Sequence, residues 1–220
     1  METKGVDFAA IPTTAIRVLT APAAFFREMP KTGGFVEPLV FMVAMGLVGG
    51  AIQVVVNLLG MHGLAAMGAG IASIVIMPIM VTIFGFVGAA IIYVIWKVMG
   101  SQESYETAYR CGAYIAALTP ITALLGIIPY AGGAAGVALM TFFLVLASVE
   151  VHKLPAQKAW LLFGIIGAVL VVININAQFA ARRLASRLEQ SGAQMKEQAE
   201  AFKKSAAELQ KQVEQAQKRR

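Results

Sequence analysis

Residues that could carry out catalysis or hold a metal ion are few in this chain and stand far apart. His62 has no Cys, Asp or Glu nearby, and His152 has a single acidic residue within two positions. A metal site requires several convergent ligands, so neither histidine predicts one. Cys111 is the only cysteine, and Ser101 and Ser104 lack an adjacent base at a spacing that indicates nucleophilic catalysis. We therefore expect no catalytic residue, no metal and no cofactor.

Polar groups inside the apolar stretches are equally sparse. Gln53 and Asn57 stand four residues apart, and Thr119 and Thr122 flank Pro120. Charged residues buried in a membrane usually mark proton relays or ion paths, because placing a charge there is costly. The cores of the apolar stretches contain none, which argues against coupled secondary transport. A passive pore needs no such charge, so this function stays open.

Five apolar stretches form the framework that must position any functional residue of this chain. Hydrophobic residues make up 58% of the chain and charged residues 14%, with a mean hydropathy of +0.72, whereas about 25% of a soluble domain is charged. Crossing roughly 30 Å of hydrocarbon takes about 20 apolar residues, and helices of this length satisfy their backbone groups internally. The predicted fold is an all-α membrane protein, a bundle of five transmembrane helices. Its spans are 38–59, 71–98, 112–128, 132–148 and 159–175.

The chain divides by composition into three parts. Residues 1–37 form a cytoplasmic amphipathic segment, residues 38–176 the transmembrane domain, and residues 177–220 a charged, extramembrane helical tail. Lys and Arg occur in the first part and in the second and fourth gaps between spans, and the other two gaps hold none. By the positive-inside rule the N-terminus is cytoplasmic, and five spans then place the tail outside. The ten Lys and Arg residues of the tail oppose this placement, and one re-entrant span would move it to the cytoplasm.

Two short amphipathic helices are expected in the N-terminal segment, where residues 11–29 mix apolar and charged side chains. If these helices lie along the lipid surface, the rings of Phe25 and Phe26 enter the acyl boundary. Arg17 and Arg27 then lie among anionic headgroups. The alternative is that this stripe packs on the cytoplasmic end of the bundle itself, and the sequence does not separate the two.

Glycines, often in pairs about one helical turn apart, occur on every predicted span and leave notches in the helix surface. They include Gly46 and Gly50, Gly112, Gly132 and Gly136, and Gly164 and Gly167. Small residues about one turn apart let helix backbones approach closely, so that van der Waals contact and interhelical hydrogen bonds hold the helices together. Dimerisation through the notches is one interpretation. We favour packing of the five helices against one another, because no span lacks a notch.

The tail carries a heptad pattern from Met195 onward. Its large apolar members are Met195, Phe202, Leu209 and Val213, which we call the tail seam. Apolar residues at alternating spacings of four and three are typical of a coiled coil. The remaining heptad positions are filled by the small residues Ala199, Ala206 and Ala216, so a partner helix would bury little area. We expect either a weak coiled coil or a single amphipathic helix.

Several short motifs follow one another along the chain: Thr20–Met29, Glu37–Phe41, Gly100 before a polar turn, Tyr109–Tyr114, Ile128–Gly133, Glu150–Lys153 and Lys158–Ala159. In this order they resemble the bacterial branch of the YIP family, the Ypt/Rab-interacting membrane proteins. The resemblance implies five membrane helices, a cytoplasmic N-terminus and an external C-terminus. Eukaryotic relatives bind small GTPases, but this chain has no clear counterpart of their acidic-leucine-tyrosine-glycine-proline motif, so GTPase binding is not expected. The charged tail is an addition to the family's compact domain.

The expected function is that of a non-catalytic scaffold or membrane-organising subunit in a bacterial inner membrane. Its predicted partners are the lipid bilayer and, through the C-terminal helix, another protein or a second copy of the chain. No nucleic-acid partner is expected. The alternative is a small channel or carrier subunit, which would need a polar cavity near the middle of the membrane. The scarcity of polar residues within the spans favours the scaffold.

Overall fold

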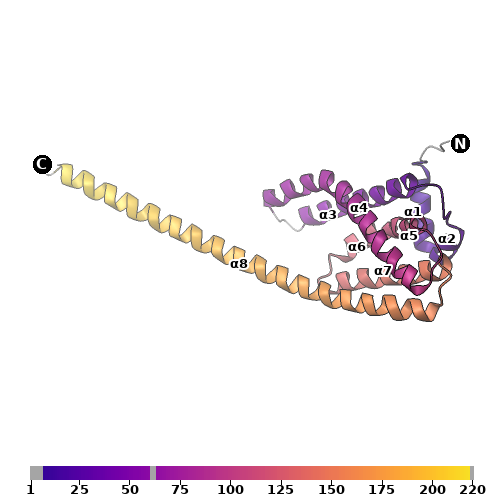
Figure 1. Cartoon of the computed structure of the whole chain (residues 1–220). Coiled ribbons are helices and arrows are strands. Elements are labelled where there is room, and N and C mark those ends of the chain that lie inside the picture. Colours follow the sequence, from indigo (N-terminus) through magenta and orange to yellow (C-terminus); the bar gives the residue numbers. More distant parts are fainter. Residues whose placement is uncertain (1–6, 60–62, 219–220) are drawn as a thin grey trace. The chain divides into compact units, whose positions relative to one another are not determined.

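The computed structural model describes residues 7–59 and 63–218, and these residues form helices joined by short connections (Figure 1). The helices are α1 (Ala10–Thr20), α2 (Pro22–Glu28), α3 (Val36–Leu59), α4 (Gly63–Met99), α5 (Tyr105–Ile115), the 3₁₀ helix η1 (Ala116–Leu118), α6 (Thr119–Leu125), α7 (Ala131–Glu150) and α8 (Ala156–Lys218). No strand occurs among the described residues. The all-α prediction is confirmed.

Within the described part of the chain, four helices are long and apolar enough to cross a membrane. These stretches are Val36–Val56 in α3, Ile79–Met99 in α4, Ala131–Glu150 in α7 and Ala156–Lys203 in α8. On α4, exposed apolar side chains such as Phe84, Ile91 and Val98 recur at about two-turn intervals, with exposed fractions of 63%, 58% and 83%. A row of this kind suits a face turned to lipid. The prediction of a membrane protein with several spanning helices is confirmed.

The predicted third span, 112–128, is not one helix. α5 ends at Ile115, three residues follow in η1, and α6 begins at Thr119. Pro120 lies in the first turn of α6, where it has no N–H to donate and its ring excludes regular α-helix in the turn before it. A short 3₁₀ segment is a common way to accommodate such a position. This span is therefore interrupted, and the count of five continuous spans is not confirmed.

The chain separates into two compact units, Met1–Asn174 and Ile175–Arg220. In the first unit, the core lies where the N-terminal helices meet α5 and α7. Trp96, Tyr109, Arg110 and Phe26 are its largest fully buried side chains. The second unit is helical throughout its described length, because α8 continues without interruption to Lys218.

Phe25 and Phe26 on α2 pack inside the first unit. Their exposed fractions are 7% and 1%. The Phe25 ring lies edge-on to Tyr114 with centroids 5.0 Å apart, and the Phe26 ring lies edge-on to Phe143 at 6.4 Å. Burial against α5 and α7 satisfies the apolar rings without lipid. In the structure the rings therefore pack on the bundle itself, which is the second of the two alternatives that the sequence left open.

Of the seven glycines expected at helix contacts, four approach a neighbouring helix. A Cβ atom built on Gly46 would lie 3.3 Å from Val81, and one on Gly136 would lie 3.3 Å from Thr122. A Cβ on Gly167 would overlap the Thr141 side chain, and one on Gly132 would overlap the backbone of Leu125. A Cβ on Gly50, Gly112 or Gly164 would meet nothing within 4 Å among the described residues.

Replacing Gly132 with Ala should destabilise the contact between α6 and α7 by about 1–3 kcal/mol, because the methyl group meets backbone that cannot rotate away. The measurement is thermal unfolding in mild detergent. Gly164→Ala is the matched control, since its methyl group has open space and alanine favours a helix over glycine by up to about 1 kcal/mol. Equal melting temperatures for the two variants would contradict the close approach at Gly132.

Candidate functional site

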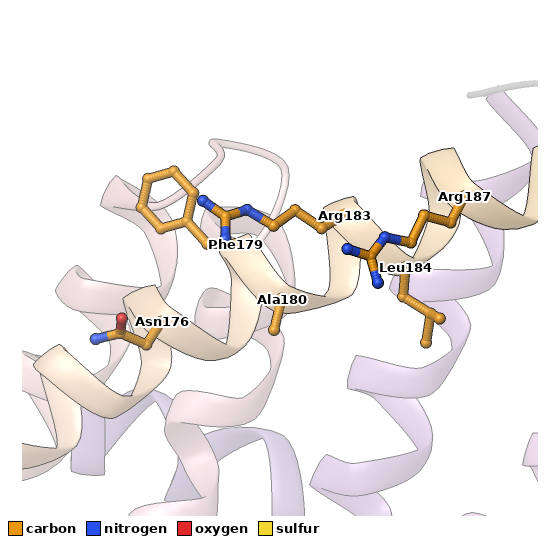
Figure 2. A pocket seen from close by; sticks show the side chains of 6 residues that line it. All are labelled: Asn176, Phe179, Ala180, Arg183, Leu184 and Arg187. Atoms are coloured by element: carbon orange, nitrogen blue, oxygen red, sulfur yellow. The ribbon is translucent and has the colours of Figure 1, made fainter.

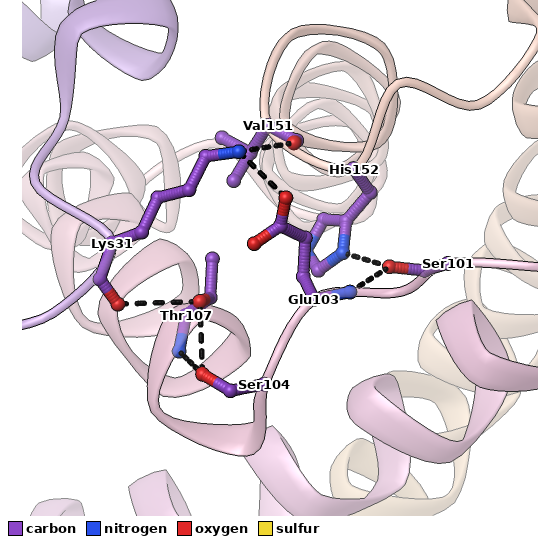
Figure 3. Close-up of polar contacts among 7 residues, drawn as sticks. All are labelled: Lys31, Ser101, Glu103, Ser104, Thr107, Val151 and His152. Atoms are coloured by element: carbon purple, nitrogen blue, oxygen red, sulfur yellow. Dashed lines mark hydrogen bonds and ion pairs between the residues drawn. The ribbon is translucent and has the colours of Figure 1, made fainter.

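Three connections between helices meet at one end of the first unit, and we call this place the loop junction. It consists of residues 29–35 between α2 and α3, 100–104 between α4 and α5, and 151–155 between α7 and α8. Figure 3 shows how one side chain joins all three. The Lys31 ammonium donates to Glu103 Oε1 at 2.6 Å and to the Val151 carbonyl at 3.3 Å. The ends of four long helices are thereby held together by polar contacts.

The start of α5 contributes several of these contacts. Ser104 is its N-cap, and the Ser104 hydroxyl accepts from the backbone N–H of Thr107 at 3.2 Å. A serine cap satisfies an N–H that has no partner within the helix. The Thr107 hydroxyl donates to the carbonyl of Lys31 at 3.2 Å, and the Glu106 carboxylate accepts from the N–H of Gly34 at 2.6 Å. The first turn of α5 therefore fixes the backbone of the connection before α3.

Arg110, one turn further along α5, holds the same connection from the inside. Its exposed fraction is 1%. Nε donates to the Pro30 carbonyl at 2.7 Å, and one terminal nitrogen donates to the Gly34 carbonyl at 2.9 Å. The other terminal nitrogen lies 3.4 Å from a carboxylate oxygen of Glu37. A planar guanidinium with five donors suits such a set of partners, whereas a lysine would supply one point charge.

A buried group around His152 closes the side of the junction next to α4. The imidazole lies against Trp96 with ring centroids 3.8 Å apart, and Nδ1 shares a hydrogen bond of 2.7 Å with the Ser101 hydroxyl. Trp96 Nε1 donates to the Ser148 hydroxyl at 2.7 Å. Nε2 of His152 has no hydrogen-bond partner among the described residues. Burial lowers the pKa of His152 to about 4, with Lys31 and Lys97 also lowering it and Glu103 opposing them, so the imidazole is neutral at pH 7.

Two arginines expected at the lipid surface form ion pairs at the rim of the junction. Arg27 donates two hydrogen bonds to the Glu150 carboxylate, at 2.9 and 3.0 Å, and so ties α2 to the end of α7. Arg17 pairs with Glu28, which ties α1 to α2. Both arginine side chains are more than half exposed, so headgroup contact stays compatible with their positions.

The junction brings together a hydroxyl and an imidazole that the sequence did not place side by side. Ser101 and His152 are 51 residues apart, and their exposed fractions are 3% and 5%. A substrate has no access to a pair buried so deeply, and an imidazole with a pKa of about 4 is a weak base at neutral pH. No group of three or more metal-ligating side chains occurs among the described residues. The polar side chains of the junction therefore hold the three connections together, and we call this set of contacts the latch.

The family model of the Yip1 domain matches residues 16–175. The chain belongs to this family. No curated protein and no solved structure matches it. The matched stretch contains the entire loop junction and ends one residue after the first compact unit, which ends at Asn174. The Yip1 domain therefore accounts for the bundle and its latch, and the tail beyond residue 175 lies outside the match.

The tail seam lies in this second part. Met195 and Phe202 are 70% and 75% exposed, so most of each side chain is accessible to a partner helix. Leu209 and Val213 belong to α8, and their side chains lie outside the described part of the structure. The seam predicted from the heptad pattern is thus open at both described positions and stays a prediction.

Proposed function

We propose that this Yip1-domain protein is a non-catalytic scaffold subunit of a bacterial inner membrane, which recruits a protein partner or a second copy through its tail. The observation that carries the proposal is the row of exposed apolar side chains on the tail, Leu188, Met195 and Phe202, with exposed fractions of 64%, 70% and 75%. Large apolar side chains in such a row are typical of a helix that pairs with another helix.

The lining of the groove in the helix bundle favours a scaffold function over a carrier function. A groove of about 470 Å³ is lined by residues of α3, α4, α5, η1, α6 and α7. Most of its lining is apolar or glycine, including Met42, Val81 and Val137, and Thr119 and Thr122 supply its only hydroxyls. A carrier site near the membrane midplane needs backbone or side-chain polar groups that replace the water around its substrate. A channel or carrier subunit is therefore the weaker alternative.

Weakening the seam should remove contacts of the tail and leave the bundle intact. We expect the double change Met195→Gln and Phe202→Gln to lower photocrosslinking from a reactive residue at Ala199 by at least about tenfold in intact membranes, because the partner loses two large apolar contacts. The matched control changes Gln194 and Gln198 to Ala on neighbouring positions of α8. Unchanged crosslinking in the seam variant would refute recruitment through the seam.

The proposed topology has the N-terminus in the cytoplasm and the tail outside. Contacts at the loop junction support it, because the connections before α3, after α4 and after α7 lie at the same end of the bundle. The segment from α5 through α6 must then lead away from that end, since α7 returns to it. Five passes follow, with the interrupted helix as the third.

Cysteine labelling in intact cells tests this topology. Ile128→Cys, in an exposed turn before α7, and Ser186→Cys on the tail should react with an impermeant thiol reagent. Gln102→Cys at the loop junction should react only after the membrane is permeabilised. Cys111 gives no background because it is fully buried. Labelling of Ser186→Cys together with Gln102→Cys, and not with Ile128→Cys, would show that the tail is cytoplasmic.

A further inference from the structure

The first turns of α8 beyond the last span differ in charge from the rest of the tail. Arg182, Arg183 and Arg187 fall in residues 176–188, which contain no Asp or Glu. Residues 189–220 mix basic and acidic side chains. We call residues 176–188 the basic collar. Its three positive charges stand immediately after the predicted span 159–175, and the collar itself has no acidic residue.

Apolar side chains share the collar with the arginines. Phe179 is 48% exposed and Leu184 is 58% exposed. Figure 2 shows one flank of the helix, where Arg183 and Arg187 extend back along the helix toward its N-terminal side and the guanidinium of Arg183 points toward the Phe179 ring. Helical side chains lean toward the N-terminus in general. In this helix, the N-terminal direction leads to the membrane span, so the lean carries each charge toward the bilayer.

Distances along the helix place these charges at the level of lipid headgroups. With a rise of about 1.5 Å per residue, Arg182 and Arg183 stand roughly 10–12 Å beyond residue 175, and Arg187 roughly 18 Å beyond it. The headgroup layer extends about 5–8 Å past the hydrocarbon on each side. A long side chain that leans back toward the membrane covers the difference for the first two arginines. The third stays outside the layer, at a distance from it comparable with the Debye length of about 8–10 Å, and so attracts the anionic surface through space.

We propose that the basic collar binds anionic phospholipid, with Arg182 and Arg183 holding headgroup phosphates, Arg187 adding attraction at longer range, and Phe179 lying in the interfacial layer. A guanidinium pairs with phosphate through two parallel hydrogen bonds, which a lysine ammonium does not form. Aromatic and aliphatic side chains beside basic ones are typical of segments that bind an anionic membrane surface. This site is separate from the tail seam, which begins at Met195.

The test uses the full chain, reconstituted in vesicles of phosphatidylcholine alone or of phosphatidylcholine with phosphatidylglycerol. A dye on Ala185→Cys reports its distance from the surface through quenching by lipids with a nitroxide in the headgroup. The buried Cys111 stays unlabelled. We expect stronger quenching in vesicles that contain phosphatidylglycerol, and a smaller difference at high salt because mobile ions screen the charges.

Changing all three arginines to Gln should abolish this dependence on phosphatidylglycerol. Each basic residue near an anionic surface contributes roughly fivefold to the affinity for that surface. The affinity of the collar for phosphatidylglycerol, read from the difference in quenching between the two kinds of vesicle, should therefore fall by at least about tenfold. The matched control removes three charges further along the same helix, through Lys196→Gln, Lys203→Gln and Lys204→Gln, and should keep the preference. Equal quenching in the two kinds of vesicle, or equal loss in both triple variants, would overturn the proposal. Crosslinking through the tail seam is measured on the same variants, so failure of the collar is distinguished from failure of the scaffold.

Discussion

Replacing Arg110 with Gln should lower the free energy of unfolding by about 2–4 kcal/mol. The guanidinium is 1% exposed and donates to the carbonyls of Pro30 and Gly34. Hydrogen bonds to a charged group contribute about 1.5–3 kcal/mol each, and a glutamine amide at this position is too short to reach both carbonyls. Part of the loss is recovered because water reaches the exposed connection that carries the two carbonyls.

The exposed Arg27 provides the control for this experiment. It forms a two-pronged ion pair with Glu150, and its own side chain is 63% exposed. Pairs with a solvated partner contribute about 0–1 kcal/mol, so Arg27→Gln should change the melting temperature little. Arg110→Lys should recover only part of the wild-type stability, because a single ammonium nitrogen cannot take the place of the two guanidinium nitrogens that donate to the two carbonyls. Thermal unfolding in mild detergent measures all three variants, and equal effects of Arg110→Gln and Arg27→Gln would refute the latch at the loop junction.

The membrane helices were predictable because they depend on a property that adds up along the sequence. About 20 consecutive apolar residues define a span whatever lies around them, and α3, α4, α7 and α8 all contain such a stretch. The interruption between α5 and α6 carried a local signal, since Pro120 stands in the middle of the predicted span. Membrane helices tolerate proline with local adjustment, so the residue alone did not determine whether the span kinks or breaks.

The loop junction was not predictable in the same way. Lys31, Glu103 and Val151 come from three separate connections, and a sequence pattern gives no distance between residues so far apart. The charged residues of the connections indicated orientation through the positive-inside rule, although several of them form ion pairs instead of lying free in solvent. One local signal was present: Ser104 followed by Glu106 and Thr107 is typical of a helix start, and that start anchors the junction.

The aromatic residues of α2 show how amphipathic patterns leave two partners open. Phe25 and Phe26 beside Arg27 suit a lipid surface or a protein surface equally well, because both are apolar on one side and wet on the other. Tertiary packing decides between them, and here Tyr114 and Phe143 supply edge-on ring contacts. The exposed tail presents the same ambiguity, which only a partner resolves.

Acidification should destabilise the bundle through His152. Its ordinary pKa is 6.5 and burial lowers this to about 4 in the folded protein. Between these values the unfolded chain binds a proton that the folded chain does not, so stability falls as the pH falls from about 6.5 to about 4. The expected loss is about 2 kcal/mol between pH 7 and pH 5 and about 3 kcal/mol in all. Above pH 7 both states are neutral at this residue, and no further change arises from it.

The surroundings of the imidazole explain why the protonated form is not accommodated. Lys31 and Lys97 oppose a positive charge there, and Glu103, which favours it, is already paired with Lys31 at 2.6 Å. Protonation would also give both ring nitrogens a charged N–H, and Nε2 has no hydrogen-bond partner among the described residues. The contacts that hold the connection after α7 against the connection after α4 should therefore loosen in acid.

Two measurements check this expectation. Thermal unfolding between pH 7 and pH 5 should show a falling melting temperature in the wild type, a much flatter profile in His152→Gln, and a wild-type profile in His62→Gln, which removes the only other histidine. With Trp160→Phe, Trp96 becomes the single tryptophan, and its emission should change over the same pH range if the stack opens. A His152→Gln variant that keeps the wild-type slope would show that another group is responsible, because the argument depends on this one imidazole being neutral in the folded protein and charged in the unfolded chain.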